Sequence, residues 1–169
     1  REQADSWAVD AHKWLNVPYD SAFAIVKHGE TLHSALGISA AYLGRSGRRE
    51  PAEWVPEASR RARAIPIYAA LRSLGRRGVA ELVERCCAEA ELMAELLRAG
   101  GREVLNDVVL NQVLVAGTPA QLARIQADGT CWLGGTTWRG RHALRISFSN
   151  WSTTDDDVRR SARAILDAG

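Results

Sequence analysis

The stretch from Val79 to Leu97 is the sequence feature that most restricts how this chain folds. Its apolar residues recur at spacings of three and four, so they share one face of a helix, while Glu81 and Glu84 fall on the opposite face. Gly100-Gly101 follows directly and predicts that the helix ends there. The apolar face consists of Val79, Leu82, Val83, Cys86, Ala90, Met93 and Leu97.

Shorter elements are predicted in the first half of the chain. Residues 6–9 and 22–26 are apolar runs of strand length, and Pro18-Tyr19-Asp20 is a turn signal between them. Residues 37–53 are rich in Gly, Arg and small side chains, which predicts a mobile loop. A helix is expected after Pro56 to about Leu74, with a kink or break at Pro66.

The second half of the chain carries stronger local signals. Thr118-Pro119-Ala120-Gln121 predicts a capped helix to about Gln126, and Thr154, followed by three aspartates, predicts a final helix to about Leu166. Strands are expected at 111–115, 130–133 and 143–149, with a turn at 134–137. This order indicates an α/β fold with a mostly antiparallel small sheet, because strands and helices do not alternate as in a βαβ array.

Composition excludes several classes of protein. The chain has 169 residues, 46% hydrophobic and 25% charged, as in ordinary globular domains, and no apolar run is long enough for a membrane span. Its formal net charge of +2 is too small to indicate a nucleic-acid or anionic membrane partner. The three cysteines fit neither a disulfide framework nor a zinc site, so a cytoplasmic location is expected and no metal site is assigned.

Lysine is almost absent, which makes Lys13 a candidate catalytic residue. The chain has 22 lysines and arginines together, and only Lys13 and Lys27 are lysines. Arginine cannot give up its proton in a protein, whereas a deprotonated lysine amine can form a Schiff base with a carbonyl compound. Lys27 ends an apolar run and has no comparable setting. From these residues alone, a solvated lysine beside a packed Trp14 stays an alternative.

The segment around Lys13 resembles that of a known enzyme family. Asp10-Ala11-His12-Lys13-Trp14, within residues 4–20, is similar to the cofactor-lysine segment of the pyridoxal-phosphate-dependent amino-acid decarboxylases. These include the aromatic amino acid, tyrosine, histidine and glutamate decarboxylases, all of the aspartate-aminotransferase fold type. Residues 54–63 resemble the family's Arg-Arg-x-Arg segment, and residues 144–150 resemble its last core strand.

The resemblance implies a domain organisation and a cofactor. Residues 1–53 would be the end of the large domain of a pyridoxal-phosphate transferase fold, 54–99 the connecting long helices, and 100–169 the small C-terminal α/β domain. The chain would then be the C-terminal part of a cytoplasmic homodimeric carboxy-lyase that uses pyridoxal 5'-phosphate to convert an L-amino acid to an amine. The isolated chain is expected to be inactive.

The same resemblance assigns residue roles. Lys13 would be the catalytic Schiff-base lysine. His12 would contact the cofactor phosphate, and Asp10 would lie on the same phosphate-side loop. From the residues alone, His12 could equally be a structural histidine, and Asp10 could simply cap the end of a strand.

Other polar residues are weaker candidates. Arg60, Arg61 and Arg63 form a basic cluster that either has an acidic or phosphate partner or is a solvated face. Arg145 could bind a substrate carboxylate, but decarboxylases do not generally hold in that way the carboxylate they eject. Trp14 is expected to pack in the core.

One position departs from the family pattern. Pro51 stands where a loop tyrosine that reprotonates the intermediate is expected, and Tyr42 is poorly placed to replace it. The protonation step therefore has no evident donor. The alternatives are a pyridoxal-phosphate enzyme of aldehyde-synthase or aldolase type, or a non-catalytic fragment that acts only in folding or dimerisation.

Overall fold

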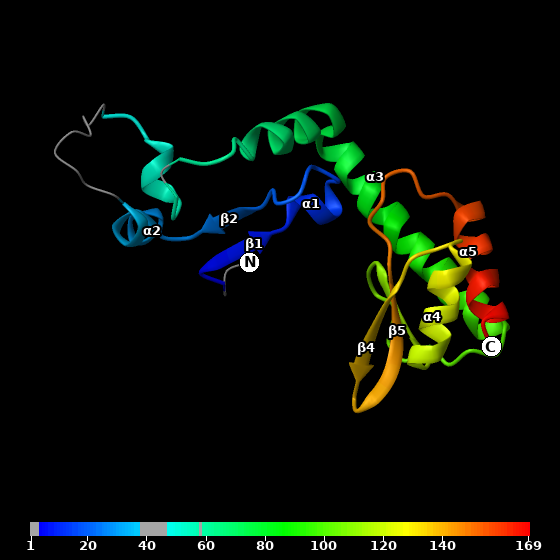
Figure 1. Ribbon diagram of the computed structural model, residues 1–169. Coiled ribbons are helices and arrows are strands. Elements are labelled where there is room, and N and C mark those ends of the chain that lie inside the picture. The colour runs from blue at the N-terminus through cyan, green and yellow to red at the C-terminus, as the bar shows by residue number, and fades with distance from the viewer. Residues whose placement is uncertain (1–3, 38–46, 58) are drawn as a thin grey trace. The chain divides into compact units, whose positions relative to one another are not determined.

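The computed structural model describes residues 4–37, 47–57 and 59–169. The chain divides into two compact units, Arg1–Arg72 and Ser73–Gly169. Each unit is described by itself below, and Figure 1 shows the elements of both. The three-part division into 1–53, 54–99 and 100–169 stays a prediction.

The first unit is built on a two-stranded antiparallel sheet. β1 (Ser6–Val9) pairs with β2 (Phe23–Val26), and the short helix α1 (Ala11–Trp14) lies between them in the chain. Both strands agree closely with the sequence prediction. The helix α2 (Gly29–Leu36) and the 3₁₀-helix η1 (Pro51–Trp54) follow. The sequence pattern did not indicate α2, and η1 occupies the end of the predicted loop, whose residues 38–46 lie outside the described part.

A small apolar cluster holds the first unit together. Ala11 from α1, Val17 from the turn and Ile67 from the first part of the next helix are all buried and pack together. Leu15, Phe23 and Ala70 pack against them. The cluster places α1 on a fixed support, because its buried residues come from three separate parts of the chain.

The long helix α3 (Ala64–Ala99) corrects two predictions. It begins at Ala64 rather than soon after Pro56, so Pro66 lies in its first turn, where a missing N–H breaks no helical hydrogen bond. The interruption falls instead at Gly75, whose φ of 62° and ψ of −176° are not helical. The predicted apolar face from Val79 to Leu97 is confirmed in the second part of this helix, where Leu82, Met93 and Leu97 are buried.

The predicted stop of α3 is also confirmed. The Gly101 N–H donates to Arg98 O at 3.0 Å, and the Arg102 N–H donates to Leu97 O at 2.8 Å. Gly101 has a φ of 81°, so these bonds form the Schellman arrangement that ends a helix on a left-handed glycine.

The second unit contains a three-stranded antiparallel sheet. β3 (Gln112–Ala116), β4 (Gly134–Trp138) and β5 (Arg141–Ser147) lie in the order β3-β5-β4. Leu144 and Ile146 of β5 are buried, while Arg145 and Ser147 are exposed. One face of the sheet is therefore packed and the other is open, as the alternation in the sequence predicts.

The position of β4 differs from the prediction. Residues 130–133 are not a strand, and the expected turn at 134–137 is β4 itself. The turn lies at Arg139-Gly140, whose φ values of 48° and 78° suit a two-residue hairpin between β4 and β5. A Cβ at position 135 would lie 3.0 Å from a methyl group of Leu122 in the neighbouring helix, a close contact that glycine avoids.

Two capped helices complete the second unit. α4 (Pro119–Asp128) begins with a capping box, in which the Gln121 N–H donates to Thr118 Oγ1 and the Thr118 N–H donates to Gln121 Oε1. α5 (Asp155–Asp167) begins with the same arrangement between Thr154 and Asp157. Both helix starts confirm the sequence prediction, as does the antiparallel character of the sheet. No described helix is both long and apolar enough to cross a membrane.

Glu89 is the one acidic side chain among the buried residues of the described chain. It is 2% exposed, its two oxygens have no hydrogen-bond partner among the described residues, and the nearest cation, Arg85 Nε, lies 3.8 Å away. Burial raises the pKa of the Glu89 carboxyl, and the negative charges of Asp155 and Asp157 act in the same direction against the partial compensation by Arg85. The folded state therefore favours the protonated form of this carboxyl.

We expect Glu89→Gln to make folding less dependent on pH. A raised pKa in the folded state means that the native protein loses stability as the pH rises above the ordinary carboxyl value of 4.5. The glutamine cannot ionise, so the variant should gain on the order of 1 kcal/mol over wild type at pH 8 and little at pH 4. Urea unfolding at both pH values measures this, with the exposed Glu84→Gln as control. A gain of equal size at both pH values would contradict the assignment.

Candidate active site

Lys13 lies on α1, the short helix between β1 and β2. The helix closes with the Leu15 N–H donating to Ala11 O at 3.1 Å, and Asn16, with a φ of 52°, turns the chain out of it. Ala11 is fully buried while the Lys13 side chain is 64% exposed. One side of α1 is thus fixed in the apolar cluster, and the amine points away from it.

Ser21 O fixes the position of His12. The backbone N–H of His12 donates to this carbonyl at 3.0 Å, and the ring Nδ1 lies 3.1 Å from the same oxygen. A carbonyl only accepts, so Nδ1 carries the proton and the neutral ring has its lone pair on Nε2. The ring also packs against Tyr19, with centroids 4.4 Å apart. His12 therefore has a fixed ring position and one nitrogen left for another partner.

The Lys13 amine forms an ion pair within its own segment. Its Nζ lies 2.6 Å from Asp10 Oδ2. The ammonium and its hydrogen bond hold the pKa of the Asp10 carboxyl below its usual range. Asp10 occupies the N-cap position of α1, but its side chain makes no cap hydrogen bond. The strand-end capping expected as the alternative role of Asp10 is therefore not what its side chain does here.

A guanidinium–carboxylate pair links the lysine segment, residues 10–21, to Arg63 just before α3. Arg63 Nε donates to Asp20 Oδ1 at 2.7 Å and Arg63 Nη2 donates to Asp20 Oδ2 at 3.1 Å. Each partner stabilises the charge of the other, which lowers the pKa of Asp20 and raises that of Arg63. The arginine cluster thus has an acidic partner, one of the two readings that the sequence left open.

The other two arginines of the cluster bind backbone oxygens. Arg61 Nη1 donates to Tyr19 O at 3.4 Å, beside Asp20, and Arg60 Nη1 donates to Glu57 O at 2.7 Å. A groove of about 990 Å³ runs past the cluster, but Lys13 is not among its lining residues. The contacts of Arg61 and Arg63 with residues 19 and 20 were not predictable from the sequence, because more than 40 positions separate the partners.

The remaining candidates are placed as follows. Trp14 is half-buried, short of the core position expected for it. Pro51 begins η1, and Tyr42 lies outside the described residues. Lys27 extends the β1–β2 pairing through its backbone, whose N–H donates to Asp5 O at 2.9 Å. Arg145 is exposed on β5 of the second unit. Within the described ranges, no group of three or more His, Cys, Asp or Glu side chains could hold a metal ion.

The residues around Lys13 fit an aldehyde cofactor that carries a phosphate. An exposed primary amine on a supported helix can react with a carbonyl carbon. The free Nε2 of His12 is a suitable partner for a phosphate oxygen when it is protonated. The donor set on α1 therefore matches the two polar ends of pyridoxal phosphate.

The comparisons with known proteins agree with this chemistry. Residues 2–116 match the conserved domain of the pyridoxal-dependent decarboxylases. Histidine decarboxylase of Drosophila melanogaster is 25% identical over 167 residues, which cover 93% of this chain and 20% of that protein. A 3,4-dihydroxyphenylacetaldehyde synthase of Aedes aegypti is 26% identical over 106 residues, which cover 60% of this chain and 20% of that protein.

A solved structure shows the same fold. The crystal structure of Oryza sativa TDC with PLP and tryptamine superposes with a TM-score of 0.88 at 22% identity, over 99% of this chain and 39% of that one. The chain thus spans between a fifth and two fifths of the length of these relatives.

Together these matches define a pyridoxal-phosphate-dependent enzyme fold. The chain belongs to the pyridoxal-dependent decarboxylase family, and pyridoxal phosphate is the cofactor of that family. The expected α/β fold class and the family resemblance are both confirmed. The roles of Lys13, His12 and Asp10 stay predictions.

We expect Arg63→Lys to loosen the lysine segment. A lysine offers a point charge and cannot form the two parallel hydrogen bonds that Arg63 makes with Asp20. Because the pair is partly exposed, the effect should be modest, roughly a two- to fivefold faster hydrogen exchange of the amides from His12 to Ser21. Arg60→Lys is the matched control, since Arg60 binds only carbonyls of residues 51–57. Equal exchange in both variants would show that the Arg63 pair does not hold the segment.

Proposed function

We propose that the protein is a pyridoxal-phosphate-dependent amino-acid decarboxylase in which Lys13 is the catalytic lysine. The observation that carries the proposal is the Lys13 amine itself, exposed on a helix whose other side is buried, and paired with Asp10 at 2.6 Å. Family membership supports this assignment. Since the chain spans only part of the length of its relatives, the activity of the whole protein is a proposal throughout.

When bound, pyridoxal phosphate supplies an electron-withdrawing ring that accepts the electron pair left at the α-carbon after the carboxylate departs. The residues of this chain supply position and protons. Lys13 offers the nitrogen that holds the cofactor aldehyde, and Asp10 keeps that amine in place before it reacts. His12, oriented by Ser21 O, presents Nε2 to the phosphate.

The place of Asp10 in this scheme follows from its charge. A carboxylate repels a phosphate, whereas it attracts the lysine ammonium with which it is paired. We therefore propose that Asp10 acts on the cofactor mainly through Lys13.

The product depends on how the α-carbon is reprotonated. Pro51 stands where the family pattern places a tyrosine, and a relative named as an aldehyde synthase is among the similar proteins. We propose the amine as the product. An aldehyde is the second candidate, since an unprotonated intermediate is open to oxidation. Nothing in the described residues favours aldol-type cleavage or a non-catalytic role.

The partners follow from the family in the same way. We propose an L-amino acid as substrate, a homodimer as the assembly and the cytoplasm as the compartment. The three cysteines are all free in the structure, which agrees with a reducing compartment. Composition gives no reason to expect nucleic acid or a membrane as a partner.

We expect borohydride to fix a pyridoxyl group on Lys13. The native protein is incubated with pyridoxal phosphate, reduced, digested and mapped by mass spectrometry, and the absorbance is recorded before reduction. The chain offers a built-in comparison, because Lys27 is its only other lysine. Lys13→Arg should lose both the label and the long-wavelength band, because a guanidinium does not react, whereas Lys27→Arg should keep both. A label that stays after Lys13→Arg, or that lies on Lys27, would overturn the proposal.

We expect amine and carbon dioxide in equal amounts from the cofactor-loaded whole protein, whereas the isolated 169-residue chain is expected to be inactive. Chromatography of reactions with individual L-amino acids identifies the amine, and oxygen consumption monitors the competing route. Lys13→Ala should reduce turnover by at least about 10³-fold, since covalent catalysis depends on the nucleophile. Aldehyde with matching oxygen uptake would replace decarboxylation by oxidative deamination and would leave the assignment of Lys13 intact.

A further inference from the structure

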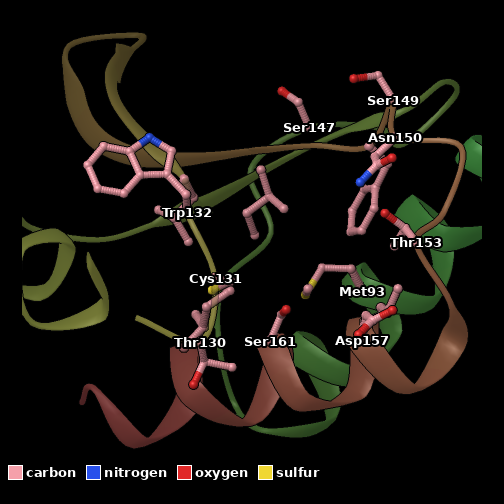
Figure 2. A pocket seen from close by; sticks show the side chains of 15 residues that line it. Met93, Thr130, Cys131, Trp132, Ser147, Ser149, Asn150, Thr153, Asp157 and Ser161 are labelled. Atoms are coloured by element: carbon pink, nitrogen blue, oxygen red, sulfur yellow. The ribbon is translucent and has the colours of Figure 1, made fainter. Parts of the chain in front are cut away.

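The second unit contains a cavity that has no part in the proposed chemistry of Lys13. It has a volume of about 370 Å³, within the range of small-molecule sites, and lies where β5 and the segment after it face α5 (Figure 2). All of its lining residues belong to the second unit.

The floor of the cavity is apolar and partly aromatic. Met93 of α3 projects into its centre in Figure 2. Ile146 of β5 and Phe148, which follows β5, also line it. All three side chains are buried. The Trp132 indole, which is 80% exposed, stands at the margin. A thioether beside aromatic rings favours a planar aromatic guest, because sulfur and ring edges attract each other.

The rim is polar but holds no cation. Hydroxyl groups of Thr130, Thr153 and Ser161 lie along it, together with the Cys131 thiol, whereas the Ser147 hydroxyl points away from Met93 in Figure 2. The Thr130 side chain hydrogen-bonds the Asp128 carboxylate, and the Ser161 hydroxyl hydrogen-bonds the Cys131 thiol. A hydroxyl that donates one hydrogen bond keeps lone pairs that can accept one from a guest.

Asp157 is the only charged residue that lines the cavity. Hydrogen bonds from Thr154 and the contact with Arg160 lower the pKa of its carboxyl, so it is ionised at neutral pH. These groups occupy three of its roughly four acceptor positions and leave one for another donor. No lysine, arginine or histidine lines the cavity. A guest with a carboxylate or phosphate would lose its hydration there without gaining a counter-ion.

We propose that this cavity binds a small aromatic amine and rejects the corresponding amino acid. The aromatic ring would lie on Met93 and Phe148, and the ammonium would meet the rim hydroxyls and the open position on Asp157. The choice of an amine as the natural guest rests on the proposed function, because an amine is what an amino acid becomes when its carboxylate is lost. The cavity would thus be a product-sensing site in the second unit.

Phenethylamine and L-phenylalanine are the matched probes, because they differ only in the carboxylate. The three cysteines provide the readout: Cys131 lines the cavity, whereas Cys86 and Cys87 do not. Burial raises the pKa of the Cys131 thiol, so alkylation with iodoacetamide is run at pH 8.5 and followed by mass spectrometry. Phenethylamine should slow alkylation of Cys131 saturably and leave Cys87 unaffected. Phenylalanine should need at least a tenfold higher concentration.

A variant that introduces a positive charge separates recognition from simple loss of structure. Thr153 is partly exposed in the segment after β5 and lines the cavity, so Thr153→Lys should fold, and it should reverse the order of the two probes by supplying the missing cation. Thr137→Lys, exposed on β4 away from the cavity, should keep the wild-type order.

The experiment is run on the Lys13→Ala variant without added cofactor, so that its result does not depend on catalysis. Protection that is absent, equal for both probes or unchanged in Thr153→Lys would overturn the cavity proposal. The function proposed for Lys13 would then be unaffected.

Discussion

The carbonyl oxygen of Ser21 is the contact on which the geometry of the lysine segment depends. It accepts the His12 backbone N–H at 3.0 Å and lies 3.1 Å from the ring Nδ1, so one atom sets both the path of the chain and the tautomer of the imidazole. Lys13 is the next residue, and Ala11, the residue before, is fully buried. The two residues that precede Lys13, Ala11 and His12, thus fix the backbone that carries its side chain. The contact itself is local in the chain, because the turn at Pro18 brings Ser21 back to α1.

Local signals in the sequence predicted the elements that local contacts stabilise. The caps at Thr118 and Thr154 bind residues three positions away, and the stop after α3 uses Gly101 and its neighbours, so each could be inferred from a few consecutive letters. β4 could not. Gly134 and Gly135 have low strand propensity, and they form a strand because β5 pairs with them and Leu122 needs the space. The start of α3 was also misplaced: Arg61 and Arg63 precede it and bind residues 19 and 20, contacts that no local pattern indicates.

The candidate site shows the same difference between contacts that are local in the sequence and contacts between distant positions. Lys13, His12 and Asp10 were identified from five consecutive residues, and the structure brings Lys13 and Asp10 into contact as an i, i+3 pair on one short helix. The supports of the site, Ser21, Asp20 and Arg63, were not identified as partners, because no periodicity links positions 20 and 63. Arg63 was singled out only as one of several unexplained cations. Sequence therefore indicated the chemistry of the site, and the three-dimensional contacts were needed to show what holds it.

The scarcity of lysine acquires a physical meaning in this segment. Arg63 and Lys13 both bind carboxylates of the same segment, Asp20 and Asp10, and neither could take the place of the other. The guanidinium binds both oxygens of Asp20 and cannot act as a nucleophile at any physiological pH, so it can hold the segment beside an aldehyde without competing for it. The Lys13 amine makes a weaker, single-point contact with Asp10, which it can leave when a carbonyl group arrives. A second lysine at position 63 would offer a rival amine and a poorer clamp. Under the role proposed for Lys13, the nearly exclusive use of arginine elsewhere in the chain keeps the Schiff-base amine chemically distinct from the charges that support its segment.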